Sequence, residues 1–213
     1  MRGRPRKVEG AENSRQRILD AAVCLAARVG LDALTISLLA DEVGMSKAGL
    51  FAHFGSKEEL QLAAIDTARK CFLKDVLSPV QHVERGVPRL YQTMMAWIRS
   101  LESQKDRGGC FFYAANAEFD GKPGAVRDTL TEVSRQWLDW LTRQAALAVE
   151  RGHLTPDTDP EQLAFELHAF GQEANWASQL LHDDLAFERA RGAVHKQLLE
   201  HCTEVGRQWL PTR

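Results

Sequence analysis

Cysteine is scarce in this chain of 213 residues, and its four cysteines lie far apart. None belongs to a Cys-x-x-Cys pair, which is the spacing that zinc sites and redox motifs use. Their separation also argues against a dense disulfide framework. We therefore expect no metal site and four buried, reduced thiols, which are Cys24, Cys71, Cys110 and Cys202.

Long apolar runs are also absent. No stretch approaches the roughly 20 residues that a membrane-spanning helix requires. The basic N-terminus is not followed by the apolar segment of a signal peptide. We therefore expect a cytoplasmic protein that has no membrane partner.

Enzyme motifs are missing as well, since the chain has no Gly-x-Ser-x-Gly elbow, Walker loop or dinucleotide-binding glycine pattern. Two groups of polar residues resemble metal or acid-base sites, namely residues 182–184 (His-Asp-Asp) and the set Glu166, His168 and Glu173. The first falls in a predicted loop between helices, and the second lacks the one-turn pairing of a helical zinc motif. We therefore expect neither catalysis nor a cofactor.

Charge is unevenly distributed. The net charge is −2, but residues 1–7 carry four positive charges and no negative one. Residues 61–213 carry 18 basic and 21 acidic side chains, so most of the chain is close to neutral. Attraction to a polyanion such as DNA would therefore be confined to the N-terminal part.

Apolar residues recur at helical spacing throughout the chain, and no alternating strand pattern or internal repeat occurs. Glycine and proline mark the breaks between the segments. The sequence therefore predicts an all-α fold of about nine helices, with approximate ranges 14–29, 36–43, 46–54, 56–77, 87–101, 110–119, 126–150, 161–182 and 185–209.

The most informative segment runs from residue 34 to residue 60 and has the pattern of a helix-turn-helix. An apolar face at residues 36, 39, 40 and 43 is followed by Gly44, which suits a helix C-terminus. Ser46 can cap a second short helix, on which Leu50 and Phe54 face inward. Small and basic residues then remain on the outward face, where a helix can approach base edges in a major groove.

The segment LTISLLADEVGMSKAGLFAHFGSKEEL resembles the DNA-binding head of tetracycline-repressor (TetR) family regulators over roughly residues 12–65. Phe51 stands where the family usually has tyrosine, so the phosphate contact of that hydroxyl is missing here. The resemblance implies that Thr35 and Ser37 face phosphate and groove, that Ser46, Lys47, Ala48 and Gly49 lie against bases, and that Phe51, His53 and Lys57 lie near the DNA backbone.

The first seven residues form a basic arm with a Gly-Arg-Pro centre that resembles the core of AT-hook peptides. Arg2, Arg4 and Arg6 would enter a narrow A·T minor groove, where negative potential is concentrated. The alternative is a disordered tail that adds only nonspecific attraction to DNA.

The last two long helices are apolar on more than one side, which favours a partner beyond the protomer. The family resemblance implies that they pair with their copies into a four-helix bundle. The residues expected at this homodimer interface are Leu163, Leu167, Phe170, Ala174, Ala177, Leu181, Phe187, Val194 and Leu198, whereas Phe165 and Trp176 lie off the main stripes.

The resemblance also implies a pocket for a small-molecule effector of apolar character. The segment from Cys110 to Phe119 is then expected to relay ligand binding to the head. Candidate lining residues are Trp97, Phe112, Trp137, Trp140 and Trp176, with His168, Gln172 or Glu173 as polar anchors.

Together these features predict a flexible arm (1–10), a three-helix helix-turn-helix head (11–56), and a larger helical ligand-binding and dimerisation domain (57–213). The expected function is that of a ligand-responsive repressor, bound as a homodimer to a palindromic operator in double-stranded DNA. An activator of the same fold, a nonspecific architectural DNA-binding protein and an enzyme are the alternatives.

Overall fold

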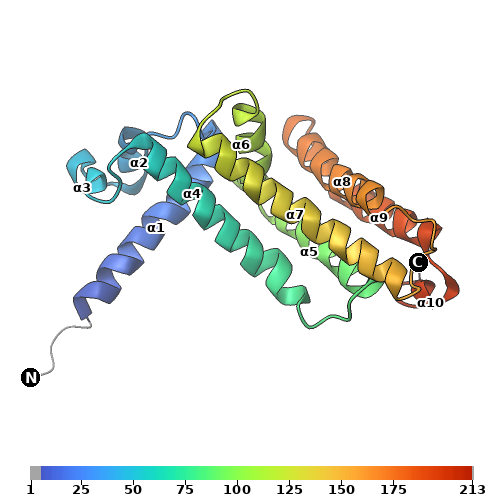
Figure 1. Ribbon diagram of the computed structural model, residues 1–213. Helices are drawn as coiled ribbons and strands as arrows, with labels where there is room; N and C mark the ends of the chain where they lie inside the picture. Colours follow the sequence, from blue (N-terminus) through green and yellow to red (C-terminus); the bar gives the residue numbers. More distant parts are fainter. Residues whose placement is uncertain (1–5, 213) are drawn as a thin grey trace, which may run out of the picture. The chain divides into compact units, whose positions relative to one another are not determined.

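The computed structural model describes residues 6–212, with side chains from residue 14 onward (Figure 1). Over this range the chain forms α-helices joined by loops and short helical turns, as expected. The helices are α1 (Arg6–Val29), α2 (Ile36–Val43), α3 (Lys47–Phe51), α4 (Lys57–Phe72), α5 (Val87–Ser103), α6 (Phe111–Phe119), α7 (Ala125–Glu150), α8 (Pro160–Leu180), α9 (Ala186–His201) and α10 (Glu204–Arg207).

Helix α1 begins at Arg6, earlier than the residue near 14 that apolar spacing suggested. Residues 6–10, which we expected in a flexible arm, therefore belong to a helix. No proline interrupts the sequence from Arg6 to Val29, so a helix can extend over this whole range. Arg2 and Arg4 lie outside the described residues.

The chain divides into two compact units. The head unit consists of residues up to Lys70 together with Phe111–Thr131, and the body unit consists of Cys71–Cys110 together with residues from Glu132 onward. Helix α6 and most of α4 thus belong to the same unit as the helix-turn-helix.

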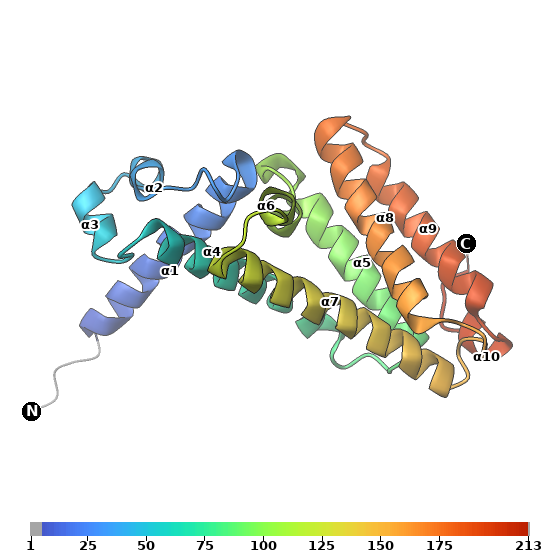
Figure 2. The ribbon, with the colours of Figure 1, turned by 45° about the horizontal axis from the view of Figure 1, so that its top comes forward.

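In the head unit, α1 packs against α2 and α6, and α2 packs against α3 (Figure 2). Leu50 and Phe54 are buried, as their spacing predicted, and the guanidinium of Arg15 lies 5.3 Å from the centre of the Phe54 ring. The small core is completed by apolar residues of the flanking helices, among them Ile18, Ala22, Leu25, Leu39, Ala40, Leu60 and Ala64.

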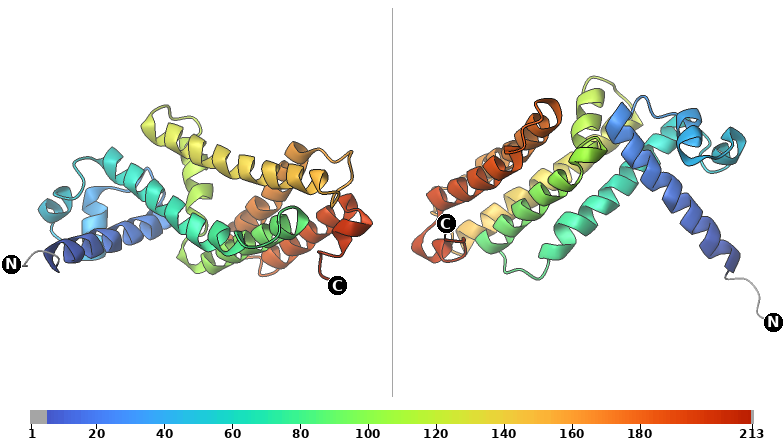
Figure 3. Two further views of the ribbon diagram at one scale, coloured as in Figure 1. Left: turned by 60° about the horizontal axis from the view of Figure 1, so that its bottom comes forward. Right: turned by 180° about the vertical axis from the view of Figure 1, so that it is seen from behind.

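In the body unit, α5 packs against α8 and α9, which lie side by side (Figure 3). Its core includes Leu90, Met94, Ile98, Leu101 and Leu141, all at or near zero exposure. No helix of the described chain is long and apolar enough to cross a membrane.

The last predicted helix is interrupted, because α9 ends at His201 and Cys202 is extended. Cys202 forms an isolated bridge with Leu154, and Thr203 then caps α10. A Cβ at Gly206 would lie 1.9 Å from the carbonyl oxygen of His153, so only glycine fits there. This close approach bends the chain back onto the loop after α7.

Candidate DNA-reading and effector sites

Hydrogen bonds at its ends position each helix of the helix-turn-helix. Thr35 Oγ1 accepts from the backbone N–H of Leu38 at 3.1 Å and caps α2. Gly44 ends α2 with a φ of 67°, a conformation that favours glycine. Ser46 Oγ accepts from the N–H of Gly49 at 3.1 Å and caps α3. The tight turn therefore comes from local hydrogen bonds and one glycine.

The start of α3 is open to solvent. Ser46, Lys47 and Ala48 are exposed and Gly49 is half-buried, whereas Leu50 of the same helix is buried. The Phe51 ring is 53% exposed, which is unusual for a large apolar side chain. These residues form one accessible surface, on which a charge and small side chains surround the helix N-terminus.

Lys57, which we expect near the DNA backbone, forms an ion pair within the head unit. Its Nζ donates to Asp32 Oδ1 at 3.0 Å, and Lys122 Nζ donates to Asp32 Oδ2 at 2.8 Å. The hydrogen bonds from Lys122 and Lys57 lower the pKa of Asp32. Asp32 comes from the turn before α2 and was not expected to be near Lys57, so this ion pair could not be read from the spacing.

Helix α6 is bonded to the turn between α1 and α2. Glu118 Oε2 accepts from the backbone N–H groups of Leu31, at 2.6 Å, and Asp32, at 3.1 Å. Buried Gln61 donates to the carbonyl oxygen of Leu31 at 2.8 Å. Helices α4 and α6 therefore both hold the turn that precedes α2. Glu118 and Gln61 were not among the predicted site residues.

Several predicted effector residues do meet in the body unit. Trp97 of α5 lies 5.2 Å from Trp137 of α7 and stacks on His168 of α8, with ring centres 5.3 Å apart and planes 1° from parallel. Trp137 also contacts Trp140 and, edge-on, Phe72. We call Trp97, Trp137, Trp140, His168 and Gln172 the aromatic cluster.

Polar atoms inside the aromatic cluster bond to one another. Trp137 Nε1–H donates to His168 Nδ1 at 3.1 Å, and the Gln172 amide lies 3.1 Å from His168 Nε2. Burial lowers the pKa of His168 to about 4, so the ring is neutral near pH 7. The cluster is therefore uncharged but contains directional hydrogen-bonding groups.

Gly171 explains how Trp97 reaches α8. A Cβ at this position would lie 2.3 Å from an atom of the Trp97 ring, so the absence of a side chain makes room for the indole. Phe112, in contrast, packs edge-on against Phe111 and belongs to the head unit. Trp176 is half-buried further along α8 and makes none of the ring contacts that define the cluster.

Comparison with known proteins identifies both units. The profile described as "Bacterial regulatory proteins, tetR family" matches residues 18–64, and "Tetracyclin repressor-like, C-terminal domain" matches residues 86–194. The second match alone spans half of the chain. The protein belongs to the TetR family. It is a DNA-binding transcriptional regulator.

Relatives of this TetR-family regulator include named repressors. The chain is 26% identical over 180 residues to the HTH-type transcriptional repressor KstR2 of Mycobacterium tuberculosis, covering 81% of this chain and 83% of that protein. It is also 26% identical over 149 residues to the HTH-type transcriptional regulator SrpR of Pseudomonas putida, covering 70% and 67% of the two chains.

Solved structures share the fold. A TetR transcriptional regulator from Chloroflexus aurantiacus superposes with a TM-score of 0.81 at 22% identity, covering 91% of this chain and 98% of that one. AibR, solved with isovaleryl coenzyme A and operator DNA, superposes with a TM-score of 0.70 at 25% identity, covering 85% and 97%.

Most residues that we expected at the dimer interface of this regulator are covered within the protomer itself. Helices α8 and α9 turn their main apolar stripes toward each other and toward α5. Phe170 and Ala177 are partly buried against the same core, and only Leu181 is exposed, at 59%. The side chains covered by the protomer are Leu163, Leu167, Ala174, Phe187, Val194 and Leu198.

The opposite face of α8 remains uncovered. Phe165 is 66% exposed and Leu180 is 63% exposed, while Ala169 between them is exposed and Trp176 is half-buried. These four residues fall at helical spacing, so they share one side of the helix. We call them the outer face of α8. The sequence contained this signal as the apolar residues off the main stripe.

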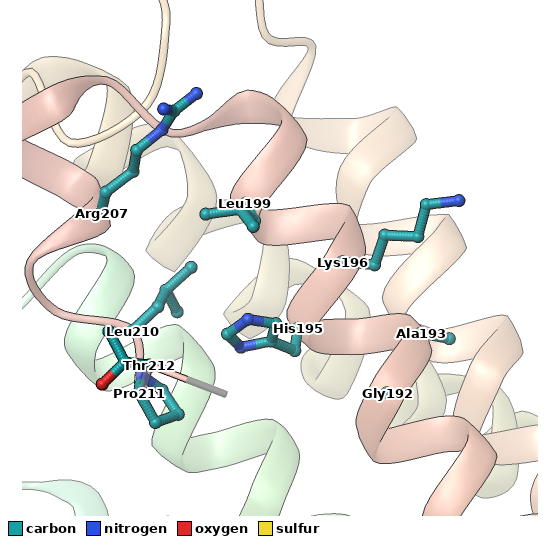
Figure 4. Close-up of a pocket in the computed structure, with 9 residues that line it drawn as sticks. All are labelled: Gly192, Ala193, His195, Lys196, Leu199, Arg207, Leu210, Pro211 and Thr212. Atoms are coloured by element: carbon teal, nitrogen blue, oxygen red, sulfur yellow. The ribbon is translucent and has the colours of Figure 1, made fainter.

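A cavity of about 690 Å³ lies elsewhere in the body unit, between α9 and the C-terminal residues (Figure 4). The His195 ring faces Leu210, while Lys196 extends in the opposite direction. None of the predicted effector residues lines this cavity, which is bordered by Gly192, Ala193, His195, Lys196, Leu199, Arg207, Leu210, Pro211 and Thr212.

The two polar groups that resembled metal or acid-base sites have other partners. Glu166 accepts from Gln162 and from Gln197, at 2.8 Å and 2.6 Å, whereas His168 belongs to the aromatic cluster. Asp183 pairs with Arg189 in the loop before α9. These contacts are structural hydrogen bonds and ion pairs of the body unit.

Proposed function

We propose that this regulator is a cytoplasmic, homodimeric repressor that occupies a palindromic operator and leaves it when an apolar small molecule binds. The observation that carries this proposal is the exposed start of α3 on a buried three-helix core. Steric occupation of a promoter requires no chemistry from the protein. Its relatives that are named repressors favour repression over activation by the same fold.

The DNA contacts would come from the exposed surface of α2 and α3. Lys47 would donate to base acceptors, while the small side chains of Ser46, Ala48 and Gly49 allow the backbone close approach. Phe51, Thr35, Ser37 and His53 would border the phosphates. Two heads would then read successive major grooves about 34–36 Å apart. Arg2, Arg4 and Arg6 would add minor-groove or phosphate contacts next to these sites.

Dimerisation would use the outer face of α8. An exposed row containing Phe165 and Leu180 is costly in water, and a second copy covers it by the same face across a two-fold axis. This face lies opposite the apolar stripe of α8 that packs into the protomer. Of the residues expected at the interface from the sequence, Leu181 at the end of α8 is the one that is exposed.

The effector would bind at the aromatic cluster and act on the head through the polypeptide itself. Asn175 Oδ1 of α8 accepts from the backbone N–H of Cys110 at 3.0 Å, directly before α6 begins. Glu118 near the end of α6 bonds the turn before α2. A shift of α8 therefore has a covalent route through α6 to the DNA-reading helices.

Selection of bound DNA from a random pool with the full-length protein tests the proposal. We expect enrichment of one inverted repeat, because two identical heads related by a two-fold axis read the same half-site twice. Recovery of DNA without a common sequence would favour a nonspecific architectural protein. A single, non-repeated motif would contradict the symmetric dimer.

A further inference from the structure

The hydrogen bonds of the aromatic cluster determine where the proton of His168 lies. An indole N–H can only donate, so the bond from Trp137 makes His168 Nδ1 an acceptor. A neutral imidazole then carries its hydrogen on Nε2. This nitrogen faces the Gln172 amide at 3.1 Å, so the atom it meets must be an acceptor.

The orientation of the Gln172 amide follows from this. With Nε2 of the amide toward the ring, two donors would face each other, and Oε1 would be buried without a partner among the described residues. A half-turn of the amide places Oε1 on the N–H of His168. The NH₂ group then occupies the position without a partner, so a buried amide donor in the cluster lacks an acceptor.

The surroundings of this donor are apolar and uncharged. Trp97 and Trp137 enclose the His168 ring, and burial keeps that ring neutral near pH 7. The five residues of the aromatic cluster include no lysine or arginine that could balance an anionic ligand. A buried charge without a partner is strongly disfavoured, whereas a neutral acceptor fits such a site.

We propose that the effector is an uncharged molecule with a flat, largely apolar body and a carbonyl-type oxygen that accepts a hydrogen bond from the Gln172 amide. The inference rests on the proposed effector role of the aromatic cluster and adds the chemical class. The body of the molecule packs against the indoles, and the oxygen satisfies the donor that the protein leaves without an acceptor. A carboxylate would find no compensating cation among the five residues of the cluster.

Three naphthalene probes of similar size test separately whether the effector needs a hydrogen-bond acceptor and whether it must be uncharged. They are 2-acetonaphthone, a neutral ketone, 2-ethylnaphthalene, which has no acceptor, and 2-naphthoate, an anion at neutral pH. Isothermal titration calorimetry with the full-length protein gives each Kd, and the indole N–H resonance of Trp137 reports whether binding is at the cluster. We expect the ketone to bind at least about tenfold more tightly than either other probe.

Two variants test whether the preference for the ketone over the hydrocarbon depends on the Gln172 amide. Gln172→Leu keeps a side chain of similar size without the amide and should reduce the ketone's advantage over the hydrocarbon to about onefold. Gln144, one turn beyond Trp140 on α7, is the matched control, since its side-chain oxygen is also buried without a partner in the described structure. Gln144→Leu should leave the advantage unchanged.

Several results would overturn the inference: equal or tighter binding of the anion or the hydrocarbon, no probe that perturbs Trp137, or loss of the preference in Gln144→Leu alone. The order of probe affinities and the Trp137 resonance are measured on the unmodified protein, so both results are obtained even if a variant does not fold. Operator binding without any probe is measured separately. A protein that releases the operator with 2-naphthoate and not with the ketone keeps the proposed function and refutes this effector class.

Discussion

At the DNA-reading surface, two hydroxyl groups and one glycine determine where the exposed side chains lie. Thr35 and Ser46 cap α2 and α3, and Gly44 makes the turn between them. Each oxygen accepts one hydrogen bond in its cap, and each hydroxyl hydrogen remains able to donate. Lys47 is the one cation at the start of α3 and is exposed.

Replacement of Lys47 by alanine should therefore relax the preference at one base pair of each half-site. A lost bidentate contact to guanine corresponds to about 1–3 kcal/mol of discrimination. Fluorescence anisotropy with all single-base variants of the selected operator measures this. An affinity that falls equally for every variant would indicate a phosphate contact instead.

His168 should make the stability of the protein depend on pH. Its pKa falls from 6.5 in the unfolded chain to about 4 in the folded one, because burial disfavours the charged ring. The unfolded chain thus takes up a proton below about pH 6.5, and the folded chain does so only near pH 4. Stability is fully present above the unfolded pKa and is lost as the pH falls toward 4, by at most about 3 kcal/mol.

Urea unfolding followed by circular dichroism at about pH 7.5 and about pH 4.5 measures this loss. His168→Phe is the reference, because it retains a ring and removes the titrating group. The loss of stability between the two pH values should be smaller in this variant. Equal losses in the two proteins would mean that other groups cause the acid sensitivity.

Helix α8 has two apolar faces, one buried and one exposed. Leu163, Leu167 and Ala174 pack into the protomer, whereas Phe165 and Leu180 point to solvent. Gly171 and His168 lie between the buried face and the exposed face, and both adjoin Trp97. One helix thus contributes to the core, to the aromatic cluster and to the proposed dimer surface.

A charge on the outer face should separate the protomers. Phe165→Glu places two like charges near each other at the two-fold interface while the protomer keeps its fold, so we expect a stable, helical monomer. Its operator affinity should fall about 100-fold or more, because the second head no longer binds from the same molecule. Light scattering gives the mass, and thermal melting tests the fold.

Ala174→Glu is the matched control, since it introduces the same charge on the buried face of the same helix. It should lower the melting temperature of the protomer rather than produce a stable monomer. If Phe165→Glu remains a dimer, the outer face of α8 is not the interface.

The contrast between these faces shows what sequence reasoning resolves. The helix-turn-helix could be predicted because Leu50, Phe54 and Gly44 act within a few residues of one another. Helical periodicity also identified the stripe of α8 that is buried. Periodicity could not say whether an apolar stripe is covered by the same chain or by a second copy, since both produce the same pattern. The stripe with Leu163, Leu167 and Ala174 is covered by the same chain.

Contacts between residues far apart in the chain could not be predicted from the sequence. Glu118 bonds the N–H of Leu31 across 87 positions, and nothing in the local pattern of either segment indicates the other. The members of the aromatic cluster were among the candidates named from residue type and family resemblance, but which of them meet, and where the hydrogen of His168 lies, required the geometry. The interruption of the last helix at Cys202 likewise depends on the fit of Gly206 against His153.

In the molecule as a whole, each copy of the chain combines a DNA-reading head, an aromatic cluster and an exposed apolar face of α8. The family match identifies a DNA-binding regulator. The central claim is that two copies act together, so that the outer face of α8 sets the separation of the two heads on DNA.

The most direct test of this claim is a spacing series on the selected operator. Inserting roughly five base pairs, about half a helical turn, rotates one half-site to the opposite side of the duplex. The account predicts that binding, measured by fluorescence anisotropy with the full-length protein, falls to the level of an isolated half-site. Affinity that does not change with the spacing would contradict a dimer that reads both half-sites at once.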